Sequence, residues 1–239
     1  MHKDQQNLAQ AWFEHGIALR NVGRTEEAIA SYDKALEIKP DDYETWNSRG
    51  NALYNLRRDE EAITSYEKAL EIKPTYHLAW NNRGNALYNL GRDEEAITSY
   101  EKALEIKPYY HEAWYYRGHA LVNLGRHEEA ITSYNKAVEI QPDYHEAWYW
   151  QGYALYNLGR HEEAIASYDK ALEIQPDYHE AWYSKAYCYA LQGNIELALE
   201  NLQHVIYLNP DEYRQFAESD SDFDNIRGDS RFQMLIQGK

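Results

Sequence analysis

Apolar residues recur along the chain at helical spacing, in segments of about fourteen residues separated by short polar breaks. Near residue 50, Trp46, Gly50 and Leu53 are three or four positions apart, which places them on one side of a helix. A second segment keeps the same spacing at Ala96, Ile97, Tyr100, Ala103, Leu104 and Ile106. Gly91 precedes this segment and Pro108 follows it, as expected of a helix end and a helix stop. The pattern predicts antiparallel helix pairs, each helix about 21 Å long.

This helix pair is repeated at a fixed interval of 34 residues. The tryptophans that keep the interval are Trp12, Trp46, Trp80, Trp114, Trp148 and Trp182. All the prolines keep it too, namely Pro40, Pro74, Pro108, Pro142, Pro176 and Pro210. Residues 51–74 and 85–108 are identical except that Arg57 stands where the later copy has Gly91. One pair cannot bury its apolar faces alone, so the sequence predicts a stack of pairs, an all-α solenoid.

The repeated residues resemble the tetratricopeptide repeat family. The family's recurrent residues correspond here to Trp80, Gly84, Ala96, Tyr100, Ala103 and Pro108. We predict six repeats, at residues 9–42, 43–76, 77–110, 111–144, 145–178 and 179–212. The resemblance implies a right-handed superhelix of helix pairs whose first helices line a concave groove.

The two ends of the chain depart from the repeat. Residues 1–8 are expected to form an N-terminal extension that is too short for a separate capping helix. Residues 213–239 mix apolar residues with many acids and are predicted to be a helical cap over the last apolar face. Within the repeats, Arg57 is expected in a left-handed conformation, at a cost on the order of 1 kcal/mol. Asp93 is expected to cap the second helix of its repeat.

One face of each first helix varies between repeats while the opposite face is nearly constant, and we call the variable face the stripe. The resemblance implies that the stripe faces the groove and contacts the ligand. The candidate partner-binding residues on it are Asn47, Asn51, Tyr54, Asn55, Asn81, Asn85, Tyr88, Asn89, Glu112, Tyr115, His119, Glu146, Tyr149, Tyr153, Tyr156, Tyr183 and Tyr187.

The chemistry of the stripe favours an extended peptide as the partner. Asparagine both donates and accepts hydrogen bonds, so it can pair with a peptide backbone. Tyrosine supplies a large contact area with a polar tip. The glutamates favour a neutral to basic segment. Two other interpretations are solvated asparagines and tyrosines that cover a neighbouring core. Some family members clamp a terminal carboxylate with basic residues, but such residues are missing from the stripe of repeats two to five.

Charge and composition narrow the class of partner. The formal net charge of −16 argues against nucleic acid and against anionic membranes. We expect no signal peptide, because the first thirteen residues have no apolar run, and no membrane span. The single cysteine, Cys188, cannot form an internal disulfide. These features together predict a cytoplasmic protein.

Several recurrent polar residues suggest chemistry that their spacing does not support. The histidines His77, His111, His145 and His179 lie one repeat apart. Neighbouring helices are 8–10 Å apart, so these side chains cannot share one ion. We therefore predict no metal site, no cofactor and no enzymatic activity. Arg49, Arg83 and Arg117 fall on the apolar side, where we expect each to meet a carboxylate or a helix-end carbonyl at a repeat boundary.

Taken together, these features predict a non-enzymatic scaffold that binds an extended peptide segment of a partner protein. Two alternatives remain open. The repeats could stack head to tail between molecules into a homo-oligomer or filament. The chain could also be a regulatory subunit of a larger complex.

Overall fold

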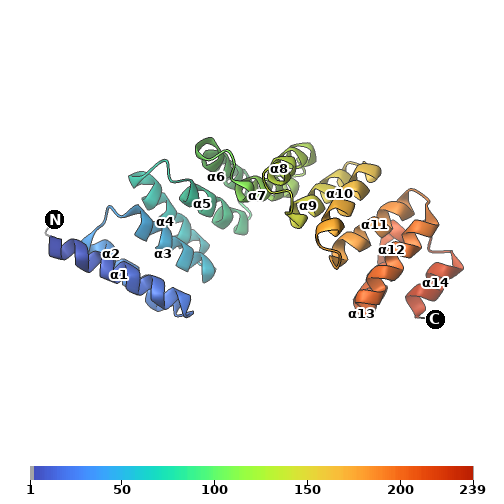
Figure 1. Ribbon diagram of the computed structural model, residues 1–239, viewed down its shortest axis with the longest axis horizontal. Coiled ribbons are helices and arrows are strands. Elements are labelled where there is room, and N and C mark those ends of the chain that lie inside the picture. The colour runs from blue at the N-terminus through green and yellow to red at the C-terminus, as the bar shows by residue number, and fades with distance from the viewer. Residues whose placement is uncertain (1–2, 239) are drawn as a thin grey trace. The chain divides into compact units, whose positions relative to one another are not determined.

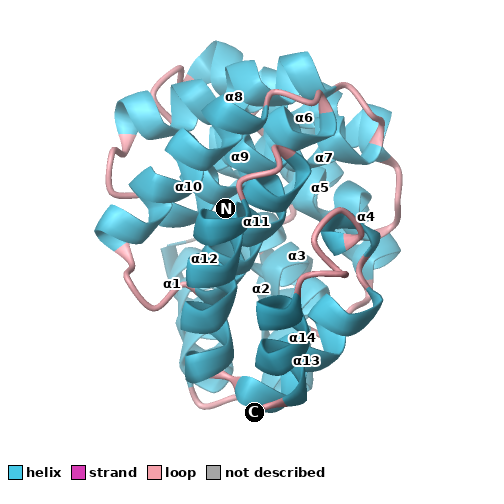
Figure 2. Ribbon diagram, turned by 90° about the vertical axis from the view of Figure 1, so that its right-hand side faces the viewer, coloured by secondary structure: helices cyan, strands magenta, loops and turns pink. Residues whose placement is uncertain are grey.

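The computed structural model describes residues 3–238. Within that range every regular element is helical, and the helices are joined by short turns and loops (Figure 2). This confirms the predicted all-α fold of antiparallel helix pairs. The chain divides into two compact units, residues 1–124 and residues 125–239, which we call unit 1 and unit 2.

Unit 1 holds three helix pairs and the first helix of the fourth repeat (Figure 1). Its helices are α1 (Lys3–Asn21), α2 (Thr25–Ile38), α3 (Tyr43–Asn55), α4 (Asp59–Ile72), α5 (His77–Asn89), α6 (Asp93–Ile106) and α7 (His111–Asn123). Each second helix packs against the first helix of its own repeat and of the next. The predicted N-terminal extension is not a separate segment, because α1 begins at Lys3 and carries residues 3–8 as its first turns. Residues 1 and 2 of that extension lie outside the described range.

Unit 2 holds the second helix of the fourth repeat, two full pairs and the C-terminal elements. Its elements are α8 (His127–Ile140), α9 (His145–Asn157), α10 (His161–Ile174), α11 (His179–Leu191), α12 (Ile195–Leu208), α13 (Pro210–Ser219), the short 3₁₀ helix η1 (Ser221–Phe223) and α14 (Ser230–Gln237). The last three elements cover α11 and α12. The buried apolar residues of these elements and of the turn between η1 and α14 are Tyr213, Ala217, Phe223, Ile226 and Phe232.

The recurrent tryptophan and proline are partners within the structure. The indole N–H of Trp46 donates to the carbonyl oxygen of Pro40 at 2.8 Å. The same bond, between 2.8 and 3.0 Å, joins the next four tryptophans to the prolines six residues before them. Because this bond fixes the entry into each first helix, the two residue types keep the same interval.

A close approach between the two helices of a repeat explains the recurrent glycine and tyrosine. A Cβ atom added to Gly50 would lie 2.5 Å from Cε1 of Tyr66, and one added to Gly84 would lie 2.6 Å from Cε1 of Tyr100. Both tyrosines are buried. The sixth repeat replaces this pair with Ala186 and Leu202, which are both fully buried. A larger residue on the first helix is thus matched by a smaller one on the second.

The turn between the paired helices requires a left-handed residue. Gly91 has φ 71°, and Arg57 has φ 60° at the same register, as predicted. The predicted capping role of Asp93 is wrong. Arg92 occupies the cap position, and the Asp93 carboxylate instead accepts a hydrogen bond from Nδ2 of Asn123 at 3.2 Å.

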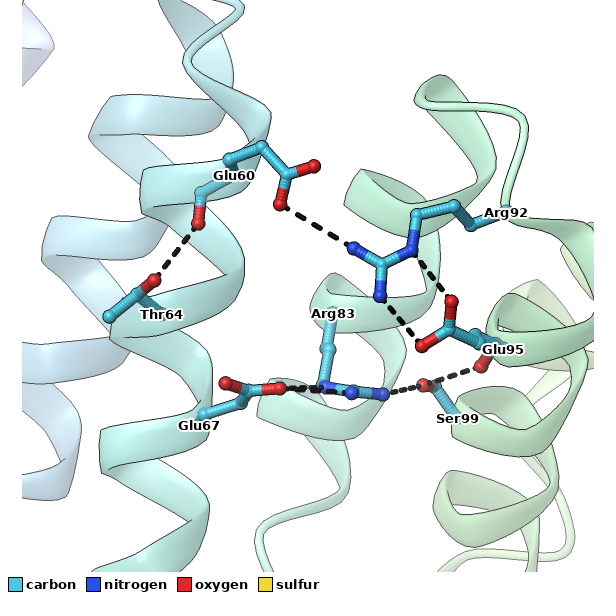
Figure 3. A network of polar contacts seen from close by, with 7 residues as sticks. All are labelled: Glu60, Thr64, Glu67, Arg83, Arg92, Glu95 and Ser99. Carbon is cyan, nitrogen blue, oxygen red and sulfur yellow. Dashed lines mark hydrogen bonds and ion pairs between the residues drawn. The ribbon is translucent and has the colours of Figure 1, made fainter.

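The arginines on the apolar side bridge consecutive repeats, which confirms the prediction for them. In Figure 3, Arg83 on α5 contacts Glu67 of the preceding repeat at 2.9 Å and the hydroxyl of Ser99 on α6 at 2.7 Å. Arg92 likewise joins Glu60 at 3.5 Å to Glu95 at 2.7 Å. The corresponding ion pairs of the other predicted arginines are Arg49 with Asp33 at 2.6 Å and Arg117 with Glu101 at 2.9 Å.

The two partners of this bridge change together in unit 2. At the register of Arg83 and Glu67, the fifth repeat has Gln151, and the residue it contacts is Asn135. The sixth repeat has Lys185, which pairs with Asp169 at 2.5 Å. An arginine without its carboxylate would be left partly buried and unpaired. This explains why a neutral residue at the arginine position occurs together with a neutral residue at the carboxylate position.

Candidate functional site

Stripe residues of unit 1 line an open pocket of about 300 Å³. Its lining comes from the first helices of three consecutive repeats and from one second helix. The residues are Arg20 on α1, Asn51, Tyr54 and Asn55 on α3, Tyr66 on α4, and Asn82 and Asn85 on α5. Four of the predicted partner-binding residues, Asn51, Tyr54, Asn55 and Asn85, therefore share one pocket.

Hydrogen bonds fix the orientation of the asparagine amides in this pocket. Oδ1 of Asn51 accepts from the hydroxyl of Tyr66 at 2.9 Å and from Nδ2 of Asn82 at 2.9 Å. Oδ1 of Asn85 accepts from the hydroxyl of Tyr100 at 2.8 Å. With both oxygens engaged, each amide has its two N–H donors left for other partners. The pocket wall is therefore rich in donors.

A positively charged side chain adds further hydrogen-bond donors to the pocket. Arg20 is the one charged residue among the described residues that line it, and within residues 3–238 it forms no ion pair. A guanidinium group carries five donors in a planar fork and stays protonated at every physiological pH. Together with the amide N–H groups of Asn51 and Asn85, it suits carbonyl or carboxylate oxygens.

Other candidate asparagines serve the packing between repeats. Asn47 and Asn81 are buried, with exposed fractions of 6% and 4%. Oδ1 of Asn47 accepts from Asn82 at 3.1 Å, and Asn89 donates to Asp59 on the preceding second helix at 3.2 Å. Burial therefore leaves little of Asn47 and Asn81 accessible to a partner in this structure.

Aromatic rings continue the stripe at the end of unit 1. Tyr115 is almost fully buried, and its ring meets the imidazole of His119 edge to face at 4.4 Å. Tyr88 lies 6.3 Å from the same imidazole. Burial lowers the pKa of His119 to about 4, so this ring is neutral at physiological pH. Glu112 lies beside the ring of His111, at 3.2 Å.

The stripe of unit 2 is more aromatic. The ring centroid of Trp150 lies 5.6 Å from that of Tyr149 and 5.2 Å from that of Tyr153. Tyr149 also meets Tyr178, the residue before the next first helix, at 5.1 Å. Glu146 lies 3.1 Å from the imidazole of His145. These rings support one another, and Tyr149 and Tyr153 are only half-buried.

The C-terminal elements occupy the last part of the stripe. The hydroxyl of Tyr183 donates to Asp220 at 2.8 Å, and that of Tyr156 donates to Asp222 at 2.5 Å. Tyr187 is buried, and its hydroxyl lies 3.3 Å from that of Tyr168. These three candidates, which were expected in an open groove, are covered in this structure. The acidic loop after α13 folds back onto Tyr156 and Tyr183, and the repeat pattern does not show this.

Three pocket residues, Arg20, Tyr66 and Asn82, were not among the predicted partner-binding residues. Arg20 lies 34 residues before Tyr54, so the repeat register could have placed it on the stripe of the first repeat. Asn82 lies next to Asn81 and was assigned to neither face. Its position became clear only with the contacts that it makes to Asn47 and Asn51 of the preceding repeat.

The recurrent histidines pack against aromatic rings. His77 meets Tyr110 edge to face at 5.4 Å, and His145 meets Tyr178 in the same way at 5.1 Å. His77 and His145 thus each begin a first helix and pack on the residue that precedes the next one, while His179 meets Tyr213 of α13 at 6.1 Å. Within residues 3–238, no three His, Cys, Asp or Glu residues are grouped as a metal site would require.

None of the helices between residues 3 and 238 combines the length and the apolar character that crossing a bilayer requires.

Profiles of the tetratricopeptide repeat family match most of the chain. One profile, described as tetratricopeptide repeat, matches residues 13–77 and 115–179, which is more than half of the sequence. Others match residues 65–98, 84–125 and 155–218. The chain therefore belongs to the tetratricopeptide repeat family. A search of curated proteins gave no significant match.

Several solved structures have a similar fold, among them those of YrrB, MamA and PilF. YrrB, described as a TPR protein with an unusual peptide-binding site, is 30% identical, with a TM-score of 0.67 over 75% of this chain and 93% of its own. MamA is 26% identical, with a TM-score of 0.67 over 71% of this chain and 93% of its own. PilF of Pseudomonas aeruginosa is 20% identical, with a TM-score of 0.74 over 90% and 98%, and shows the fold alone.

Proposed function

We propose that this protein is a non-enzymatic scaffold that binds an extended segment of a partner protein in the pocket of unit 1. Tetratricopeptide repeat proteins are in general interaction modules, and the similar protein YrrB is described as peptide-binding. The single observation that carries the proposal is the pocket of about 300 Å³. Asn51, Asn85 and Arg20 present hydrogen-bond donors to it.

The donors fit the chemistry of a peptide backbone. An extended peptide exposes carbonyl oxygens at regular spacing, and the amides of Asn51 and Asn85 stand one repeat apart along the stripe. Their oxygens are held by Tyr66 and Tyr100, so binding would cost little side-chain entropy. Preorganised amides of this kind recognise a backbone whatever its side chains are.

The charged residue that lines the pocket indicates which peptide side chains it can bind. Stripe glutamates led to the expectation of a neutral to basic segment. In unit 1, however, Arg20 is the only charge lining the pocket, among the residues described there. Glu112 lies beside His111. We therefore propose a neutral or acidic side chain at this pocket, with its carboxylate facing Arg20.

Peptide selection followed by calorimetry tests the proposal. An array of 15-residue peptides would be screened against the full chain, and the best binder would then be titrated by isothermal calorimetry. We expect Asn51→Ala and Asn85→Ala each to weaken its binding about five- to tenfold, from the loss of one or two hydrogen bonds. Arg20→Ala should weaken acidic peptides further and flatten the dependence of their binding on salt.

The matched control is Asn157→Ala. Asn157 is a stripe asparagine of unit 2 whose Nδ2 bonds to the carbonyl of Tyr153 on its own helix, at 2.8 Å. This variant should bind the selected peptide as the wild type does. If Asn51→Ala, Asn85→Ala and Arg20→Ala all retained wild-type affinity, the pocket would not be the binding site.

A further inference from the structure

A short acidic segment of unit 2 lies on the stripe as a bound peptide would. This segment, Glu218–Asp224, has the sequence ESDSDFD and joins the end of α13 to the loop before α14. Its central residues form η1, which packs on α11, the first helix of the sixth repeat. The segment contacts Tyr156 and Tyr183, and the ring of Tyr187 packs beside both of them. We call these three residues the tyrosine surface.

Side-chain contacts attach the segment to this surface. Tyr183 donates its hydroxyl hydrogen to Asp220 at 2.8 Å, and Tyr156 donates to Asp222 at 2.5 Å. The ring of Phe223 lies 5.6 Å from that of Tyr183 and is fully buried. Two carboxylates, two residues apart, and an adjacent aromatic ring thus contact the stripe. Hydrogen bonds to a charged acceptor are stronger than neutral ones.

The repeat register relates this surface to the pocket of unit 1. Tyr156 stands three repeats after Tyr54, and Tyr54 lines the open pocket. The position that is open in the second repeat is therefore covered in the fifth, and what covers it is an acidic stretch of the same chain.

Among the described residues, the two carboxylates that touch the surface form no ion pair. Arg227 pairs with Asp224 at 2.7 Å. Arg227 also donates to the backbone carbonyls of Glu218 and Asp220, which shapes the loop. The attachment of Asp220 and Asp222 to the stripe thus depends on tyrosine hydroxyls. The seven-residue segment itself contains four acids, and the net charge of the whole chain is −16.

We propose that the tyrosine surface is a recognition site for acidic segments with two carboxylates two residues apart and an adjacent aromatic ring. Glu218–Asp224 is its occupant within the chain, and a partner segment of the same chemistry exchanges with it. Exchange is feasible because the incoming ring takes the place of Phe223 and the incoming carboxylates take the same hydroxyl donors. This site is separate from the pocket of unit 1 and does not depend on it.

A labelled peptide of the chain's own sequence tests the proposal. Fluorescent ESDSDFDN, residues 218–225, would be titrated against the full chain by fluorescence anisotropy. The tethered segment competes at a local concentration on the order of millimolar, so the wild type should bind the peptide weakly. The variant Asp220→Ala/Asp222→Ala keeps Phe223 and loses both carboxylate contacts. We expect it to bind the peptide at least tenfold more tightly.

Two control variants distinguish binding at the tyrosine surface from a general effect of removing negative charge. Adding Tyr156→Phe and Tyr183→Phe to that variant should abolish the gain, since both donors are then missing. The matched variant Glu162→Ala/Asp211→Ala removes the same number of charges from exposed acids outside the segment, neither of which forms an ion pair among the described residues, and should bind as the wild type does. A gain in this variant as well, or no gain in Asp220→Ala/Asp222→Ala, would overturn the proposal.

Hydrogen exchange supplies a test that needs no variant. Millimolar unlabelled peptide added to the wild type should accelerate exchange at the amides of residues 218–224, because the tethered segment is displaced. The amide of Asp222, which donates to the side chain of Asp220 at 3.0 Å, reports this directly. Unchanged exchange at saturating peptide would contradict the proposal, whatever the variants do.

Discussion

The hydroxyl of Tyr66 donates to the side-chain oxygen of Asn51 at 2.9 Å, joining the core of a repeat to its stripe. Tyr66 is buried, while Asn51 is half-buried and lines the pocket. The same bond joins Tyr100 to Asn85 at 2.8 Å. The first repeat lacks it, because Ile17 stands where Asn51 would be, and the buried hydroxyl of Tyr32 has no hydrogen-bond partner among residues 3–238.

This difference gives a matched pair of substitutions. Tyr66→Phe should lower the free energy of unfolding by about 1 kcal/mol, since it removes a satisfied buried hydrogen bond. Tyr32→Phe removes a hydroxyl that is buried without a partner, so it should be neutral or stabilising. Urea denaturation of the two variants beside the wild type measures both effects. Equal losses in the two variants would show that the bond to Asn51 contributes nothing.

The contact between Gly50 and Tyr66 predicts a compensating double substitution. Gly50→Ala places a Cβ atom 2.5 Å from Tyr66 and should destabilise the protein by about 1–3 kcal/mol. Adding Tyr66→Leu copies the Ala186 and Leu202 pair of the sixth repeat. We expect the double variant to be more stable than the sum of the two single changes, by at least about 1 kcal/mol in a double-mutant cycle. Strict additivity would rule out the steric explanation.

The backbone at Arg57 predicts a stabilising change. Arg57 is exposed at φ 60°, where a side chain is strained and glycine is not. Arg57→Gly should therefore raise the free energy of unfolding by about 1 kcal/mol. The reverse change at the same register, Gly91→Arg, should lower it by a similar amount. A thermal or urea midpoint that moved the same way in both variants would contradict this.

His119 predicts a dependence of stability on pH. Its folded pKa of about 4 lies below the unfolded value of roughly 6.5, so between these pH values the unfolded chain binds more protons. The stabilisation is complete above pH ~6.5 and is lost as pH falls through ~4, by up to about 3 kcal/mol. Titration of the histidine side-chain NMR signals tests the pKa, and a value near 6.5 for His119 would refute it.

A variant isolates this contribution. His119→Tyr places at this register the residue that the next repeat carries, Tyr153. Between pH 7 and pH 4.5 its free energy of unfolding should fall less than that of the wild type, because the partly buried imidazole is gone. Urea denaturation at the two pH values makes the comparison.

The fold could be predicted from the sequence because the residues that make the packing contacts recur at the 34-residue interval. Trp46 and Pro40, Gly50 and Tyr66, and Gly91 each recur at a fixed interval, and each corresponds to a local contact or backbone conformation. Even the bridging role of Arg83 followed from its place on the apolar side. Asp93 was assigned wrongly as a cap, because its partner Asn123 lies thirty residues away on the next first helix.

The candidate site was predicted less completely. The predicted stripe included Asn51, Tyr54, Asn55 and Asn85 of the unit 1 pocket, since helical spacing alone places them on one face. It also included Asn47 and Asn81, which are buried in the structure. A helical wheel treats a helix as isolated, so it cannot tell which part of a face the neighbours will cover.

The sequence by itself determined the helix pairs, their number and the residues that pack within each repeat, because those interactions are local and recur with the 34-residue interval. Only the tertiary structure decided which stripe residues remain open. Asn82 of the neighbouring repeat donates to the side-chain oxygen of Asn51 and so orients its amide. Asp220 and Asp222, from a distant loop, accept hydrogen bonds from Tyr183 and Tyr156. Such contacts join residues that share no register, and they form only when the chain has folded back on itself.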